Sequence, residues 1–281
     1  MLRILSIFLF TALFTNAFAQ NSGRMTTNPS GDIQLSGIVE IGYLGVLDHK
    51  VQFSNSGTYF DYRKDGGQNV LFPVSRFSLE LRYKERNTIV LLYQPLRLET
   101  QVLLQEDLIV DDLTFPASSG VKLLYNFPFY RISYLRELVP DSETFKFALG
   151  GSLQLRNATI SFESNDGNLY RTNRDVGPVP AVKIKARREL GKRTFAEFEA
   201  DGIYAPVSYL NGSDNEVVGA ILDASLRTGI EFDQPVTSFF NLRYLGGGAV
   251  GTSAPDGPGD GYVRNWLNFF TVSVGFRYTI N

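Results

Sequence analysis

The connections between hydrophobic segments constrain the fold of this chain more than any other feature of its sequence. Some of them are tight turns, namely Glu85-Arg86-Asn87, Pro140 to Glu143, Gly191-Lys192-Arg193 and Asp233-Gln234-Pro235. Others are polar, glycine-rich loops of roughly 12 to 25 residues, longer than those a compact soluble domain usually carries. Because tight turns and long loops alternate along the chain, we expect antiparallel strands with the tight turns at one end of the sheet and the long loops at the other.

The segments between these connections alternate between apolar and polar residues. In residues 75–84, for example, Phe77 and Leu79 alternate with Arg76 and Glu80. A two-residue period indicates a strand with one apolar and one polar face. Five long loops and four tight turns give about ten strands, with eight or twelve as alternatives because prolines interrupt the third and fourth segments. The predicted strands are 33–47, 75–84, 88–98 (with Pro95), one within 121–138 (with Pro128), 144–155, 181–190, 194–204, 219–232, 236–245 and 268–280.

The N-terminal residues predict export from the cytoplasm. Arg3, the apolar run Ile4–Leu13 and the small-residue motif Ala17-Phe18-Ala19 occur in the order of a secretory signal peptide, which would comprise residues 1–19. Residues 20–31 are polar and rich in turn formers, which predicts a flexible periplasmic lead before a barrel domain at 32–281. No later apolar run is long enough for a transmembrane helix. The sequence contains no cysteine, which excludes disulfides and thiolate metal sites.

An exported chain of amphipathic strands can span a membrane as a closed barrel, because closure pairs every backbone N–H and C=O group. We therefore expect an all-β, antiparallel, up-and-down transmembrane β-barrel with short periplasmic turns and long extracellular loops. An even number of strands places both termini on the periplasmic side. The abundance of phenylalanine and tyrosine, 22 and 14 residues, suits lipid-facing strands and interfacial aromatic girdles.

At the level of pattern the chain resembles the bacterial outer-membrane β-barrel superfamily. The resemblance rests on the signal Arg3–Ala19, the alternating strands and the terminal strand Phe270–Tyr278. It implies a location in the outer membrane of a Gram-negative cell, contact with outer-membrane lipids, and assembly by the barrel-assembly machinery, which reads a terminal aromatic residue. Here Tyr278 is the last aromatic and is followed by Thr279-Ile280-Asn281, a departure from that pattern.

Two neighbouring segments carry opposite charges with the spacing of one strand face. Lys183, Lys185 and Arg187 lie on one face of the sixth strand, and Glu197, Glu199 and Asp201 lie on one face of the seventh. A three-residue turn at 191–193 pairs Arg187 with Glu197, whereas a two-residue turn would swap faces and direct the carboxylates toward lipid. Since a lysine or arginine facing lipid at the midplane costs about 2–4 kcal/mol, we expect the three-residue turn.

The predicted interior therefore holds charges of both signs at matched heights. One interpretation is a selective aqueous pathway lined by charge, and the other is a salt-bridged plug in a narrow lumen. We favour the plug, because ten strands enclose little more than the eight-strand barrel that side chains fill. The residues of this interior charge ladder are Glu80, Arg82, Lys183, Lys185, Arg187, Glu197, Glu199, Asp201, Asp223, Arg227, Arg243 and Arg277.

A plugged barrel favours a structural, adhesive or receptor-like role through the surface loops, without enzymatic activity. A narrow, porin-like channel for a small solute is the first alternative. The second is a lipid or peptide hydrolase in which His49, the single histidine, acts as general base with Ser54 or Ser56 nearby. A lone histidine at the rim of the barrel with no defined partner is more often an ordinary surface residue.

The remaining motifs predict neither a cofactor nor a metal site. The loop segments 165–168, 211–214 and 256–260 carry oxygen ligands of the kind calcium prefers, but turn chemistry explains these residue types as well. The formal net charge of −2 lacks the basic footprint of a nucleic-acid-binding protein. The expected partners are therefore membrane lipids and a small solute or extracellular ligand.

Overall fold

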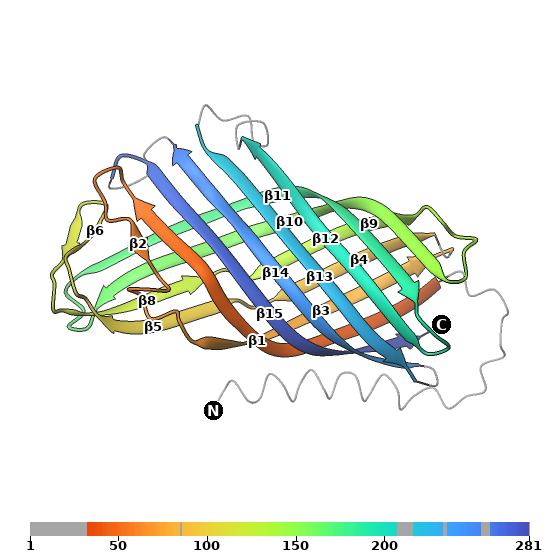
Figure 1. Ribbon diagram of the computed structural model, residues 1–281. Helices are drawn as coiled ribbons and strands as arrows, with labels where there is room; N and C mark the ends of the chain where they lie inside the picture. The colour runs from red at the N-terminus through yellow and green to blue at the C-terminus, as the bar shows by residue number, and fades with distance from the viewer. Residues whose placement is uncertain (1–32, 85, 207–215, 233–234, 254–258, 281) are drawn as a thin grey trace, which may run out of the picture. The chain divides into compact units, whose positions relative to one another are not determined.

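In the computed structural model, the chain forms a closed barrel of ten antiparallel strands (Figure 1). The structure describes residues 33–84, 86–206, 216–232, 235–253 and 259–280. The signal segment 1–19, the lead 20–31, the loop 211–214 and residues 233–234 of one predicted turn lie outside these ranges. Within the described ranges, no helix is long and apolar enough to cross a membrane. The expected fold class and strand number are confirmed.

Ten long or medium strands pair in a ring, and β1 closes it by pairing with both β15 and β3. The order around the barrel is β1, β3, β4, β9, β10, β11, β12, β13, β14, β15. Their bounds are β1 Ile33–Phe53, β3 Leu71–Tyr83, β4 Asn87–Gln94, β9 Phe129–Glu137, β10 Phe145–Ser164, β11 Tyr170–Glu189, β12 Thr194–Pro206, β13 Val218–Glu231, β14 Val236–Thr252 and β15 Tyr262–Ile280.

Shorter strands extend the barrel at its outer end. They are β2 Phe60–Asp61, β5 Arg97–Leu103, β6 Leu108–Val110, β7 Leu113–Phe115 and β8 Gly120–Asn126. Strand β5 pairs with β8, which continues onto the outer half of β10. The breaks between β4 and β5 and between β8 and β9 contain Pro95 and Pro128, as expected for residues that cannot donate to the ladder.

Several strands run much further than the sequence pattern predicts, so two predicted loops are shorter than expected. The interval 156–180 was expected to be a loop, but β10 continues to Ser164 and β11 begins at Tyr170. The expected loop at 246–264 is likewise shorter, because β14 continues to Thr252 and β15 begins at Tyr262. Residues 254–258, which include part of the loop segment 256–260, lie outside the described residues. Outward residues toward the tips of these extensions include polar ones, such as Glu163. The apolar alternation therefore disappears while the backbone ladder continues.

A band of exposed apolar side chains encircles the barrel, as lipid contact requires. Its outer edge carries an aromatic stack in which the ring of Tyr93 lies 5.1 Å from that of Tyr130 and 6.4 Å from that of Phe77. Beyond this edge the outward side chains of Asp48 and Lys50 form an ion pair of 2.8 Å. The band includes Val39, Ile41, Tyr43, Leu79, Leu81, Leu91, Ile132, Leu153, Val182, Phe198, Leu226, Phe240, Phe270 and Val274.

The interior is layered along the barrel. Near the periplasmic turns, Ile38, Phe195 and Phe239 form a small apolar cluster. Charged residues occupy the middle, and the outer half is filled mainly by a larger apolar cluster. Gly229 makes room for the lower cluster, because a Cβ atom there would lie 2.7 Å from Cβ of Phe239 and 2.8 Å from Cζ of Phe195.

Replacing Gly229 should therefore disturb the lower apolar cluster. We expect Gly229→Ala to lower the free energy of unfolding by about 1–3 kcal/mol, because the added methyl group would lie 2.3 Å from the backbone oxygen of Ser238 and would crowd Phe239 and Phe195. Urea unfolding in lipid vesicles measures the change. Gly177→Ala is the matched control, since a Cβ atom there meets nothing within 4 Å. Equal stability of the two variants would show that the lower cluster does not depend on this glycine.

Candidate functional site

The register between β11 and β12 brings the two charged faces together inside the barrel. Arg187 lies opposite Glu197, Lys185 opposite Glu199, and Lys183 opposite Asp201. This is the register that the three-residue turn predicts, and it is confirmed. The side chains of Lys183, Glu197 and Asp201 are each about 1% exposed, which leaves these charges to be neutralised by one another.

One half of the resulting network is built around the carboxylates of Asp201 and Asp223. Nζ of Lys183 lies 2.7 Å from Asp201 and 2.5 Å from Glu199. The guanidinium of Arg131 bridges Asp201, at 2.8 Å, and Asp223, at 2.9 Å. Arg243 donates to Asp223 from Nε, at 2.5 Å. Each carboxylate thereby meets two cations or a bidentate guanidinium, the geometry that stabilises a buried charge.

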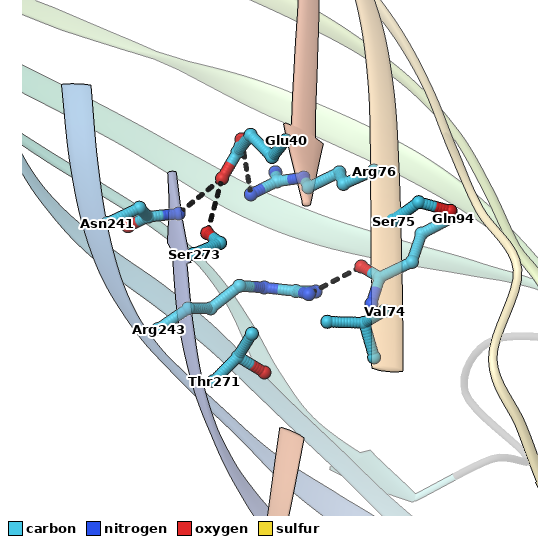
Figure 2. A pocket seen from close by; sticks show the side chains of 9 residues that line it. All are labelled: Glu40, Val74, Ser75, Arg76, Gln94, Asn241, Arg243, Thr271 and Ser273. Atoms are coloured by element: carbon cyan, nitrogen blue, oxygen red, sulfur yellow. Dashed lines mark hydrogen bonds and ion pairs between the residues drawn. The ribbon is translucent and has the colours of Figure 1, made fainter. Parts of the chain in front are cut away.

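The other half is built around Arg227 and Glu40. The Arg227 guanidinium lies 3.1 Å from Glu40, 2.9 Å from Glu197 and 3.2 Å from Glu199. Glu40 also accepts hydrogen bonds from Asn241 at 2.7 Å and Ser273 at 3.2 Å, and Arg76 reaches it from β3 at 3.8 Å (Figure 2). Arg76 lies 3.6 Å from Glu199 as well, so it connects the two halves of the network.

Toward the periplasmic end the remaining ladder residues form a less buried fringe. Lys185 lies 3.2 Å from Glu80 and 3.5 Å from Glu197, and Arg277 lies 3.5 Å from Glu80. Arg187 pairs with Glu189 at 2.7 Å and also with Glu231. Arg82, also predicted for the ladder, is half-buried opposite Gln34 close to the periplasmic turn.

We call the fully buried part of the network the charge plug. It contains carboxylates and cations in equal number. The cavity beside Glu40, Arg76, Gln94 and Arg243 has a volume of about 10 Å³, which holds about one water molecule. The charge plug consists of Glu40, Arg76, Arg131, Lys183, Glu197, Glu199, Asp201, Asp223, Arg227 and Arg243.

Three members of the plug were absent from the predicted ladder. Sequence alternation places Glu40 and Arg76 on the polar faces of their strands, but it does not show which charges they meet. Arg131 follows Pro128, and the interruption hides the phase of the alternation in that segment. Its contacts to Asp201 and Asp223 depend on distant strands that meet across the lumen.

Above the charge plug lies a second and much larger cavity, which we call the outer cavity. Its volume is about 830 Å³. Gln154 and Arg156 line it from β10, and Leu245 and Leu267 line it from β14 and β15. The rings of Tyr125, Phe127 and Phe129 contribute apolar surface from β8, β9 and the break between them, next to β10. The lumen is therefore filled by charge in its middle, and its outer half contains both the apolar cluster and this cavity.

His49 is fully buried in the outer apolar cluster, so it is not the rim residue that we expected. Its ring stacks on Tyr62 with centroids 4.5 Å apart, and Nδ1 donates to Oε1 of Gln68 at 2.8 Å. Ser54, one of its predicted partners, instead donates to Asp111 at 3.0 Å. The structure thus gives His49 a packing role, because the loop carrying Tyr62 and Gln68 covers it.

The segment 165–168 shows the turn chemistry expected from its sequence. Asp166 accepts hydrogen bonds from Oγ of Ser164 at 2.6 Å and from the backbone N–H of Asn168 at 3.1 Å. These bonds explain the residue types without a bound cation. Among the described residues, no group of three or more histidine or acidic side chains is arranged to hold a metal ion.

Removing one cation from the charge plug should be far more damaging than removing an exposed one. Arg227→Met leaves Glu40, Glu197 and Glu199 short of a partner, and we expect a loss of about 3–5 kcal/mol in the free energy of unfolding. Lys122→Met is the control, because Lys122 pairs with Glu99 at 3.5 Å on the exposed outer surface and should cost less than about 1 kcal/mol. Urea titration of both variants in vesicles compares them, and similar losses would contradict the assignment of a buried network.

His49 should make stability depend on pH below neutrality. It lies beyond the apolar band, level with the outward ion pair Asp48–Lys50. Burial lowers its pKa to about 4, although Gln68 and the charges of Asp48 and Asp61 oppose this effect. The unfolded chain, with a pKa of about 6.5, then binds a proton that the folded protein does not, so stability falls as the pH drops from 6.5 to 4.

The expected contribution is about 3 kcal/mol between these two pH values. Unfolding of wild type and His49→Phe at pH 7 and pH 4 measures it, since the variant lacks the titrating ring. The wild type should lose about 3 kcal/mol more than the variant on acidification. A parallel pH dependence in the two proteins would show that His49 is protonated to the same extent when folded and unfolded.

No protein-family model matches the chain, and no curated protein matches it. Solved structures with a similar fold include the outer-membrane protease OmpT of Escherichia coli, 10% identical over 92% of this chain and 99% of that chain with a TM-score of 0.48. A Pseudomonas aeruginosa FadL homologue is 8% identical over 88% and 90%, with a TM-score of 0.38. Ail of Yersinia pestis is 9% identical over 87% and 99%, with a TM-score of 0.33.

All of these neighbours are bacterial outer-membrane β-barrel proteins. Their sequences are too distant to transfer an activity, and they include both a protease and proteins that are not enzymes. The fold itself follows from the strand pairing of this chain and does not rest on the neighbours. Its closed ring of ten antiparallel strands, with apolar side chains outside and charges inside, is the architecture of a bacterial outer-membrane β-barrel.

Proposed function

We propose that this protein is a plugged outer-membrane barrel that works as a surface receptor or binding protein and not as a pore or an enzyme. The charge plug is the observation that carries the proposal. It extends across the lumen from β1 and β3 to β11, β12 and β13, and the cavity within it measures only about 10 Å³. An ion or solute would have to displace paired charges to pass.

Breaking these pairs is costly, because removing one partner leaves an uncompensated charge in a medium of low dielectric constant. A pore selective for ions of one sign is instead lined by charges of the opposite sign. The balanced composition of the plug therefore supports closure. Each plug residue lies in a stretch of strand that pairs with a neighbouring strand, and no hinge for opening is evident there among the described residues.

The outer half of the barrel is the part available for binding. It holds the outer cavity and carries the strand extensions of β10, β11, β14 and β15. The buried position of His49 supports a non-enzymatic role, since a general base must reach its substrate. The apolar band suits outer-membrane lipids, and insertion would use the barrel-assembly machinery that the terminal strand suggests.

Single-channel recording in planar lipid bilayers tests this function. Purified protein, shown to be folded by its heat-modifiable mobility on gels, should give no conductance steps at any salt concentration. The variant Glu40→Ser/Arg76→Ser/Glu199→Ser/Arg227→Ser removes equal numbers of each charge and should give stable steps, which shows that insertion and detection work. Salt-dependent steps from the wild type would overturn the proposal in favour of the narrow channel.

A further inference from the structure

We propose that the outer cavity binds a single-chain amphiphile with an acidic head group, which enters from the outer leaflet of the membrane through a split in the barrel wall. The proposal deepens the proposed function, because it rests on a lumen that is closed below the cavity. Three observations carry it: the interrupted pairing of β11 with β12, the apolar surface of the cavity, and an unpartnered polar group at its floor.

The pairing of β11 with β12 ends at Val182 and Gly202. From there outward β11 pairs with β10 alone, and β12 pairs with β13 alone, within the part of the chain that the structure describes. The two strands visibly diverge toward the outer end of the barrel (Figure 1). We call the facing edges, residues 176–181 of β11 and 203–206 of β12, the lateral split.

The sequence of β11 maintains the lateral split. Pro178 and Pro180 lie opposite Leu155 and Leu153 in the intact ladder with β10. A proline has no N–H group, so within a sheet it occupies positions where the ladder is not continued. The two prolines therefore leave the β12 side of β11 without donors at these positions. A shift of β12 along this edge could not restore the missing hydrogen bonds.

The lateral split opens at the height of the membrane. Leu153 and Leu155, opposite the two prolines, are exposed members of the apolar outer face. Val176, at the edge, is 66% exposed. The residues that line the outer cavity include Val176, Gly177, Pro178 and Val179 from this edge and Ile203 from β12. The cavity thus reaches the lateral split, where the surrounding solvent is lipid.

The interior of the outer cavity suits an apolar chain. Its volume of about 830 Å³ lies within the range of ligand pockets. Tyr125, Phe127 and Phe129 form a run of aromatic rings with centroids 6.2 and 4.7 Å apart. Leu245 and Leu267 provide aliphatic surface on the other strands that line it. Each of these five side chains is at most 9% exposed, so a hydrocarbon chain would meet a wall that is apolar at these positions.

Gln154 provides a hydrogen-bond donor at the floor of the cavity. Its side chain is 3% exposed. Its Oε1 accepts from Nε of Arg131 at 3.2 Å and from Nη2 at 2.7 Å, which fixes the orientation of the amide. Its Nε2 is buried and has no hydrogen-bond partner. A buried donor without an acceptor is costly, and an oxygen atom of a ligand would satisfy it.

Arg156, the next inward residue on β10, adds a positive charge beside this donor. It lines the cavity opposite Gly177 and pairs with Asp175, whose side chain is 53% exposed at the rim. Because water competes for the exposed carboxylate of Asp175, its ion pair with Arg156 is weak. A ligand carboxylate shielded in the cavity can therefore replace Asp175 as the partner of Arg156. An amide donor and a guanidinium at adjacent inward positions favour a carboxylate head group over a cationic one.

A photoreactive fatty acid tests the proposal. Diazirine-labelled palmitate is incorporated into the lipid of nanodiscs that hold the full-length protein, and adducts are mapped by mass spectrometry after irradiation. Adducts are expected on the cavity residues Phe127 and Leu267, with saturation by unlabelled palmitate. The methyl ester, which lacks the charge, should compete about tenfold less well. Adducts on outward band residues alone would overturn the proposal.

Two head-group variants separate binding from simple partition into lipid. Gln154→Glu keeps an acceptor for Arg131 but replaces the donor by a negative charge, and it should reduce cavity adducts about tenfold. Arg156→Gln removes the cation and gives an independent test if the first variant does not fold. It should also reduce cavity adducts about tenfold. Lys122→Gln on the outer surface is the control and should change nothing. Unchanged adducts in both cavity variants would overturn the assigned head-group site.

Val176→Trp tests the route of entry, because Val176 is 66% exposed at the edge of the lateral split and a larger side chain there narrows the entrance. It should suppress labelling by membrane-borne palmitate and spare labelling by diazirine-octanoate added from the water. Equal effects on both probes would overturn lateral entry. The same protein preparation is also transferred to planar bilayers for conductance recording. A protein that gives no conductance and no cavity adducts would contradict the ligand site alone, whereas conductance steps would contradict the plug.

Discussion

The mutual neutralisation of buried charges inside the barrel is the interaction on which the rest of the structure depends. Lys183, Arg227 and their carboxylate partners could not remain ionised in a closed lumen if any of them lacked a counter-ion. Each pair joins different strands, so the pairs are satisfied in one register only. A slip of one residue would turn the charges toward lipid and the apolar side chains toward the lumen.

The same interaction divides the barrel into two functional halves. Below the plug, Phe195 and Phe239 fill the lumen with apolar rings. Above it, the charges give way to an apolar cluster with a large cavity, because β5 and β8 contribute side chains such as Leu98 and Leu123 to the interior. A barrel that is closed in its middle can act on the outer side without creating a leak between the two compartments.

The outer half also departs most from an ideal barrel. The ring of ten strands is complete only in its lower part, since β11 and β12 separate beyond Val182. Ideal closure leaves no free strand edge, and the edge here is made unsuitable for pairing by Pro178 and Pro180. A free edge at lipid height is expensive for a membrane protein. In this protein the edge lies beside the outer cavity.

The sequence by itself predicted about ten strands, with eight or twelve as alternatives. It also predicted most of the inward and outward faces and the register of β11 against β12, because lipid outside and charge inside impose a two-residue period. It could not determine the lengths of β10, β11, β14 and β15, since above the membrane both faces meet water or polar surroundings and the period is lost. Only the tertiary structure showed that Arg131 bridges Asp201 and Asp223 and that His49 is buried. These contacts join strands far apart in the chain, and their partners are chosen by the closure of the barrel, which no local pattern encodes.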